Sequence, residues 1–175
     1  MNRKIKKKLD EIIRVNHAGE FGAKRIYSAQ IKFTKKKILK EKLIEMLEEE
    51  KAHFDYFDKE MVKSRARPTV MRPIWNFGGY CLGALTCIMG EKYIHTCTEA
   101  VEEVIVEHYK SQIKYLDEKK ISKNLLVKLK KFCQEEDEHR KLAQGLVKDN
   151  DLKLDVFRNF TKGLTKIAIE ISKKV

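Results

Sequence analysis

Two copies of the motif Glu-x-x-His stand out, because each pairs a carboxylate with an imidazole at helical spacing. The first is formed by Glu50 and His53, and the second by Glu136 and His139. Residues three apart on a helix share a face, so each motif can present an oxygen and a nitrogen to one metal ion. Each motif is therefore a candidate half of a metal site.

A lone glutamate precedes each motif by a similar distance. Glu20 lies 30 residues before Glu50, and Glu102 lies 34 residues before Glu136. Four carboxylates and two imidazoles in this order are the ligand set of a carboxylate-bridged di-metal centre inside a four-helix bundle. A mixed oxygen and nitrogen shell with open positions suits iron or manganese better than zinc or calcium. The predicted ligands are Glu20, Glu50, His53, Glu102, Glu136 and His139.

Hydrophobic periodicity places these ligands on four long helices. Apolar residues recur at i, i+3, i+4 and i+7, and the glutamates and histidines are the polar members of otherwise apolar stripes. The predicted helices cover residues 5–33, 38–64, 92–118 and 123–147. The alternative, that these residues form surface ion pairs on charged helices, does not explain why they share the apolar stripes.

The turns fall where two helical hairpins need them. Residue 35 lies midway between Glu20 and Glu50, and residue 119 lies midway between Glu102 and Glu136. Each ligand would then sit roughly 20–25 Å from its turn, at the same height as its partner. Ser122 is the expected N-cap of the following helix.

A crossover and a tail complete the chain. Pro68 and Pro73 are expected to stop the second helix, and the uncharged stretch 74–90 is predicted to form a buried or interfacial helix, because it is too short and too glycine-rich for a membrane span. The tail, 151–174, is predicted to be a helix whose apolar stripe packs into the core, with a lipid-facing surface helix as the alternative. Its other face carries Arg158, Lys162 and Lys166.

Length and composition favour one all-α domain covering residues 1–175. The chain has only 2 prolines and 8 glycines to interrupt long helices. Its net charge of +12 is compatible with an anionic surface, but no run interleaves lysines with aromatics, so we expect no nucleic-acid partner. The four cysteines lack zinc-like spacing and are interpreted as free thiols in a reducing compartment.

The third predicted helix leaves its ligand open. Glu99 and Glu103 flank Glu102, and helix phase favours 102 or 99 over 103. His108 and Tyr109 are candidates for orienting a ligand or relaying protons and electrons. His17, nearly one turn before Glu20, is interpreted as a satisfied core histidine, with a role in orienting a ligand as the alternative, and His95 is interpreted as structural.

Six segments resemble the demethoxyubiquinone hydroxylase family of ubiquinone biosynthesis. They are RVNHAGEFGA (14–23), EKAHF (50–54), RPTVMRPIW (67–75), CTEAVEE (97–103), HYKSQI (108–113) and EEDEH (135–139). The resemblance covers nearly the whole chain. It assigns the metal-ligand role to Glu102 rather than Glu99 and places the family's His-Tyr pair on His108 and Tyr109.

The resemblance implies a ferritin-like four-helix bundle with additional crossover and C-terminal helices. It also implies a di-iron monooxygenase with two Fe²⁺ per chain that hydroxylates the ring of a polyprenyl benzoquinone, demethoxyubiquinone. NADH is the implied electron donor. A peripheral position on the membrane is implied, with a homo-oligomer or a complex with other ubiquinone-biosynthesis proteins as possible assemblies. Family members in eukaryotes carry a targeting extension not found here, so we expect a bacterial protein at the cytoplasmic face of the inner membrane.

Two other functions are compatible with parts of the pattern. A ferritin- or rubrerythrin-like protein for iron storage or peroxide scavenging would share the ligands but not the uncharged stretch 74–90. A basic helical adaptor would bind partner helices or nucleic acid and would hold no metal. Metal content, assembly size and lipid binding separate these functions.

Overall fold

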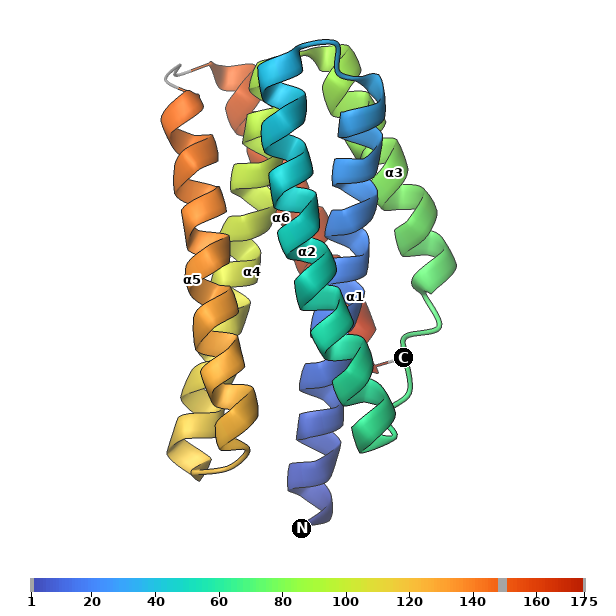
Figure 1. Cartoon of the computed structure of the whole chain (residues 1–175), viewed down its shortest axis with the longest axis vertical. Helices are drawn as coiled ribbons and strands as arrows, with labels where there is room; N and C mark the ends of the chain where they lie inside the picture. The colour runs from blue at the N-terminus through green and yellow to red at the C-terminus, as the bar shows by residue number, and fades with distance from the viewer. Residues whose placement is uncertain (1, 148–150, 175) are drawn as a thin grey trace. The chain divides into compact units, whose positions relative to one another are not determined.

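Six α-helices make up nearly all of the computed structural model, which describes residues 2–147 and 151–174 (Figure 1). No strand occurs within these ranges. The all-α, ferritin-like fold class is thus confirmed, and the helix ends differ from the predicted ones by only a few residues. The helices are α1 (Arg3–Phe33), α2 (Lys37–Ser64), α3 (Arg72–Met89), α4 (Glu91–Lys119), α5 (Lys123–Leu146) and α6 (Leu152–Lys174).

The helices divide into two compact units. The first unit contains α1, α2 and α3 together with α6 from Ile167 onward, and the second contains α4, α5 and α6 up to Lys166. Each unit therefore contains one of the two predicted hairpins. That the whole chain works as one domain remains a prediction.

In the first unit, α1 and α2 form a hairpin whose turn, residues 34–36, lies at the predicted place. The facing stripes bury Ile13, Tyr27, Leu43 and Phe57, which fixes the two helices side by side through their apolar faces.

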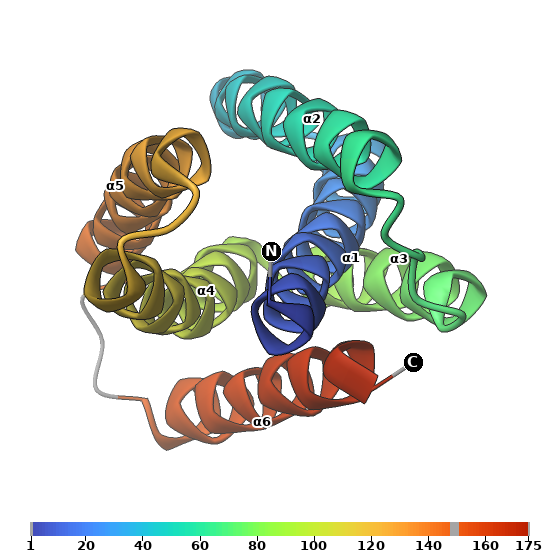
Figure 2. The ribbon, with the colours of Figure 1, turned by 90° about the horizontal axis from the view of Figure 1, so that it is seen from below.

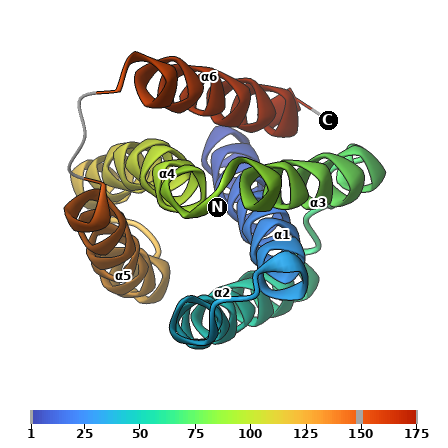
Figure 3. The same cartoon turned by 90° about the horizontal axis from the view of Figure 1, so that it is seen from above.

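Helix α3 packs closely on α1 because its glycines leave room for the α1 backbone (Figures 2 and 3). A Cβ atom built on Gly83 would lie 2.3 Å from the carbonyl oxygen of Ile26, and one on Gly79 would lie 2.9 Å from that of Gly22. A buried hydrogen bond from Gln30 Nε2 to Thr86 Oγ1, 3.1 Å long, adds to this contact. The uncharged stretch is therefore a helix that packs on α1 along its small residues.

The end of α6 is tied to α1 and α3 within the same unit. Arg14 donates from Nε to the carbonyl of Ser172 over 2.9 Å and from Nη2 to that of Lys173 over 2.7 Å. Trp75 donates from Nε1 to the Ser172 hydroxyl over 3.2 Å. The last carbonyls of a helix have no partner inside it, so the Arg14 guanidinium satisfies groups that α6 leaves open.

Two local predictions about turns need correction. Pro73 does not stop α2, which ends at Ser64 with Arg65 in the left-handed conformation; it lies in the first turn of α3, where a missing N–H costs nothing. Ser122 does precede α5, but its φ of 50° places it in the left-handed region and its side chain makes no capping hydrogen bond.

In the second unit, α4 and α5 form the other hairpin, with a buried seam that includes Tyr109, Leu116, Leu129 and Phe132.

The face that α6 turns outward differs from the prediction. Its apolar stripe is 42–77% exposed at five positions. They are Leu152, Val156, Phe160, Leu164 and Ile167.

The basic face of α6 contacts α4 instead. Arg158 pairs with Glu99, and Lys162 pairs with Glu103 over 2.6 Å. Periodicity identifies two faces of a helix but not which one is covered. Phe157 of the predicted stripe is buried, but the prediction that the apolar stripe packs into the core is wrong for the five exposed positions. Acidic residues on α4 pair with Arg158 and Lys162 of the basic face instead.

Candidate metal centre

Glu20, Glu50 and His53 lie together in the first unit. Each can offer a ligand atom within 4.8 Å of those of the other two. His53 Nδ1 is 3.7 Å from Glu20 Oε2. Glu20 comes from α1, and the other two come from adjacent turns of α2. The hairpin turn brings these residues to one height, as predicted.

Glu102, Glu136 and His139 form the matching group in the second unit. Their ligand atoms also lie within 4.8 Å of one another, and His139 Nδ1 is 3.4 Å from Glu136 Oε2. Glu102 comes from α4, and the Glu-x-x-His pair comes from α5. The two units therefore carry chemically equivalent triads of two carboxylates and one imidazole.

All six of these side chains are buried, with at most 7% exposure. An ionised carboxylate removed from water is costly unless a positive charge compensates it. Two carboxylates in each triad supply the hard oxygen donors, and the imidazole supplies the nitrogen donor, that iron and manganese accept. The donor set of each triad thus fits a divalent transition-metal ion.

The structure separates Glu102 from the glutamates beside it. Glu99 accepts a hydrogen bond from Arg158 over 3.1 Å, and Glu103 accepts one from Lys162 over 2.6 Å. Glu102 alone of the three lies with the α5 motif. Helix phase left the ligand role open between Glu102 and Glu99, and these contacts favour Glu102.

His17 lies on the same face of α1 as Glu20 and is 3% exposed. Its Nε2 is 3.2 Å from the carboxylate of Asp58 on α2, and its ring packs on Phe54 with centroids 4.5 Å apart. Burial lowers the pKa of His17 below 6.5, and the nearby Asp58 only partly opposes that shift. His17 is thus a buried histidine with a carboxylate partner, as the structural interpretation expected.

Tyr109 is buried and His108 is half-buried on α4. His108 Nε2 is 2.7 Å from Nε2 of Gln112, one turn later. Sequence reasoning missed Gln112, although its i, i+4 spacing from His108 is a readable signal. His95, interpreted as structural, lies 3.7 Å from Glu91 at the start of α4.

The four cysteines are free thiols, as predicted. Burial, with a smaller contribution from Glu102, raises the pKa of Cys97 to about 12.

Among the described residues, no helix combines the length and apolar character needed to cross a bilayer.

Sequence comparisons give the chain its relatives. Residues 7–172 match the protein family described as "Ubiquinone biosynthesis protein COQ7". A Bos taurus protein named "NADPH-dependent 3-demethoxyubiquinone 3-hydroxylase, mitochondrial" is 40% identical over 171 residues, which cover 95% of this chain and 78% of that protein. The Homo sapiens protein of the same name is 39% identical over 171 residues, with the same coverage. A Rhodospirillum rubrum protein named "3-demethoxyubiquinol 3-hydroxylase" is 35% identical over 168 residues, covering 95% of this chain and 78% of its own length.

Proposed function

The chain belongs to the ubiquinone biosynthesis protein COQ7 family, and from that premise we propose that it is a di-iron monooxygenase that hydroxylates the ring of demethoxyubiquinone. The predicted family is confirmed. The predicted enzyme class, a hydroxylating oxidoreductase of ubiquinone biosynthesis, is confirmed too, because the relatives are named hydroxylases. The di-iron centre, the oxidant, the electron donor and the membrane position are parts of the proposal.

The observation that carries the proposal is the pair of buried triads. We propose that the two units together form one ferritin-like domain, in which one triad holds the first iron and the other triad holds the second. Glu20, Glu50 and His53 would bind one ion. Glu102, Glu136 and His139 would bind the other. When bound, the reduced iron pair supplies the electrons and the dioxygen activation that the chain itself lacks.

The protein residues position and shield this chemistry. Apolar side chains such as Phe57 and Leu129, which are fully buried, exclude water from the helices that carry the triads. Each histidine must be neutral to bind a metal, and each carboxylate must be ionised. The overall reaction consumes dioxygen, two electrons and two protons; one oxygen atom enters a ring C–H bond and the other leaves as water.

The electron donor is proposed to be a nicotinamide nucleotide. The family resemblance implies NADH, whereas the names of the mammalian relatives specify NADPH. A comparison of the two nucleotides belongs in the first activity experiment.

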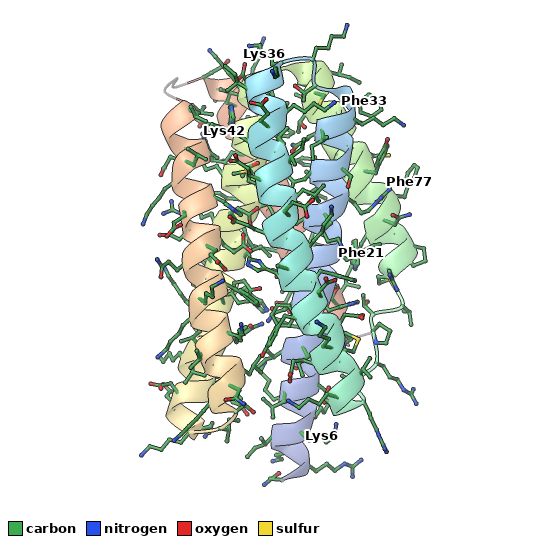
Figure 4. The ribbon with its side chains drawn as sticks, in the orientation of Figure 1. Lys6, Phe21, Phe33, Lys36, Lys42 and Phe77 are labelled. Atoms are coloured by element: carbon green, nitrogen blue, oxygen red, sulfur yellow. The ribbon has the colours of Figure 1, made fainter. Side chains whose placement is uncertain are left out.

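A polyprenyl substrate resides in lipid, so we propose that the chain works at a membrane surface, in a bacterium at the cytoplasmic face of the inner membrane. Phe77 stands 73% exposed on α3 (Figure 4), and Ile74 and Ile88 are exposed on the same helix. The exposed stripe of α6 adds further apolar surface, and the net charge of +12 favours anionic headgroups. A homo-oligomer or a complex with other proteins of the pathway is compatible with these surfaces.

The decisive experiment combines the purified chain, ferrous iron, NADH or NADPH, and demethoxyubiquinone in lipid vesicles under ¹⁸O₂. The expected product is the ring-hydroxylated quinone, detected by mass spectrometry, with one labelled oxygen atom. The variant Glu50→Ala should lose both product and iron. Glu49→Ala, which changes the exposed neighbour, should lose neither. Iron accumulation in a large soluble cage without product would instead support the storage function.

A further inference from the structure

Gln112 and His108 contact each other through side-chain nitrogens on one face of α4. The distance between Gln112 Nε2 and His108 Nε2 is 2.7 Å. Gln112 is 4% exposed, and buried Tyr109 and Leu116 lie near it along the same helix. The backbone carbonyl of His108 also accepts a hydrogen bond from the Ser111 hydroxyl over 2.7 Å. The imidazole and the backbone carbonyl of His108 thus each contact a side chain from the next helical turn.

With the amide nitrogen of Gln112 facing Nε2, this contact favours one position for the proton of His108. The nitrogen of a carboxamide group only donates hydrogen bonds, so Nε2 of the imidazole must accept. A neutral imidazole that accepts at Nε2 carries its single proton on Nδ1. An imidazolium, or a neutral ring protonated at Nε2, would direct an N–H group toward the amide N–H groups of Gln112.

We propose that Gln112 is a positioning residue that fixes His108 as the neutral imidazole with its proton on Nδ1. Its significance for catalysis rests on the proposed function: His108 then gives any proton or hydrogen bond from Nδ1, in one ring orientation. For a histidine that binds a metal, mutation of the partner that sets its tautomer costs about tenfold or more in affinity or activity, and we expect an effect of that size at His108.

The tautomer can be read directly by NMR. The full chain is labelled with ¹⁵N at histidine, and Zn²⁺ serves as a diamagnetic probe in place of iron. Long-range ¹H–¹⁵N correlations are recorded at about pH 8, where an ordinary imidazole is neutral. The His108 signals are those that disappear in His108→Gln. We expect Nε2 to show the shift of an unprotonated nitrogen and Nδ1 that of a protonated one.

Two variants test whether Gln112 is the cause. Gln112→Glu replaces the donor with an acceptor and should move most of the proton population to Nε2. Gln112→Ala should give a mixture of tautomers. Gln134→Ala is the matched control, because Gln134 makes an i, i+4 hydrogen bond of 3.0 Å to Glu138 on the exposed face of α5; it should leave His108 unchanged.

The proposal is overturned if wild-type His108 carries its proton on Nε2, a result that requires no folded variant, or if Gln112→Glu leaves the tautomer as it was. The activity measurement is separate: Gln112→Glu should lower kcat about tenfold with little change in KM, whereas Gln134→Ala should change neither. If the wild-type chain forms no hydroxylated quinone, the proposed function fails, but the tautomer result stands by itself.

Discussion

Arg158 on α6 donates a hydrogen bond from Nε to Oε2 of Glu99 on α4 over 3.1 Å. The Glu99 side chain is only 6% exposed, and the Arg158 side chain is 19% exposed. One turn further along both helices, Lys162 and Glu103 form a second pair. The basic face of α6 thus binds next to the residue of α4 that the proposed centre needs, Glu102, and it engages both neighbouring carboxylates.

The stability of the second unit should depend on the Arg158–Glu99 pair. Arg158→Ala leaves a buried carboxylate without its main cation, and we expect it to lower the free energy of unfolding by about 2 kcal/mol in urea titrations. Arg140→Ala is the control, because its partner Asp137 is 23% exposed, lies one turn away on the same helix and keeps a second cation, Lys141. That change should cost about 0.5 kcal/mol. Equal effects would contradict a special role for the pair.

Metal content should distinguish Glu102 from Glu99. Glu102→Ala removes a carboxylate from its triad, so we expect iron bound by the purified chain to fall below two ions. Glu99→Gln keeps the shape of a side chain that is bound to Arg158, so two ions should remain. The reverse outcome, measured by elemental analysis against protein concentration, would transfer the ligand role to Glu99.

Close packing of α3 on α1 predicts opposite effects for two glycines of α3. Gly83→Ala places a methyl group 2.3 Å from the Ile26 carbonyl oxygen, and the resulting backbone shift should destabilise the first unit by about 2 kcal/mol. Gly78→Ala meets no atom within 4 Å, so better helix propensity should stabilise it by roughly 0.5–1 kcal/mol. Thermal unfolding of the two variants measures both, and a neutral Gly83→Ala would mean that the helices separate easily.

The cysteines should differ sharply in reactivity. Burial raises the pKa of Cys97 to about 12, so almost none of it is thiolate at neutral pH. Cys81 is exposed and should react first with iodoacetamide. Mass spectrometry of timed samples should find Cys97 modified only at the rate of unfolding. Rapid labelling of Cys97 in the native chain would show that α4 opens locally.

His17 makes stability depend on pH in a definite direction. Its pKa is lowered in the folded chain, mainly by burial, so the unfolded chain takes up a proton first as the pH falls. The contribution of His17 is therefore fully present above pH 6.5 and is lost as the pH falls through the lower folded pKa. Urea unfolding of the metal-free chain at several pH values should show this decline.

His17→Gln should flatten the decline of stability below pH 6.5, because a glutamine takes up no proton. His95→Gln is the control, because His95 lies near Glu91 on α4, in the second unit. Its dependence of stability on pH should stay closer to that of the wild type. Identical slopes in the wild type and in His17→Gln would exclude His17 as the cause.

Relations within one helix or one hairpin could be predicted from the sequence. The three-residue spacing of Glu50 and His53 places both on one face whatever the rest of the fold does. The equal arms from Glu20 to the turn and from the turn to Glu50 bring them to one height, because the rise per residue is constant. The same reasoning placed Glu102 with the motif on α5. The contact between Gln112 and His108 could also have been predicted in this way, because the two residues are four apart on one helix.

Choices between faces of different helices were decided only by the tertiary structure. The sequence presented α6 with an apolar and a basic face, and packing left five apolar positions exposed while Arg158 and Lys162 of the basic face pair with Glu99 and Glu103 on α4. The same contact engages Glu99 and leaves Glu102 beside the α5 motif, which favours the proposed ligand role of Glu102. Backbone conformation at Ser122 likewise depended on how the chain passes from α4 to α5. Periodicity determines which residues share a face, but the partner of that face depends on charges and shapes far away in the sequence.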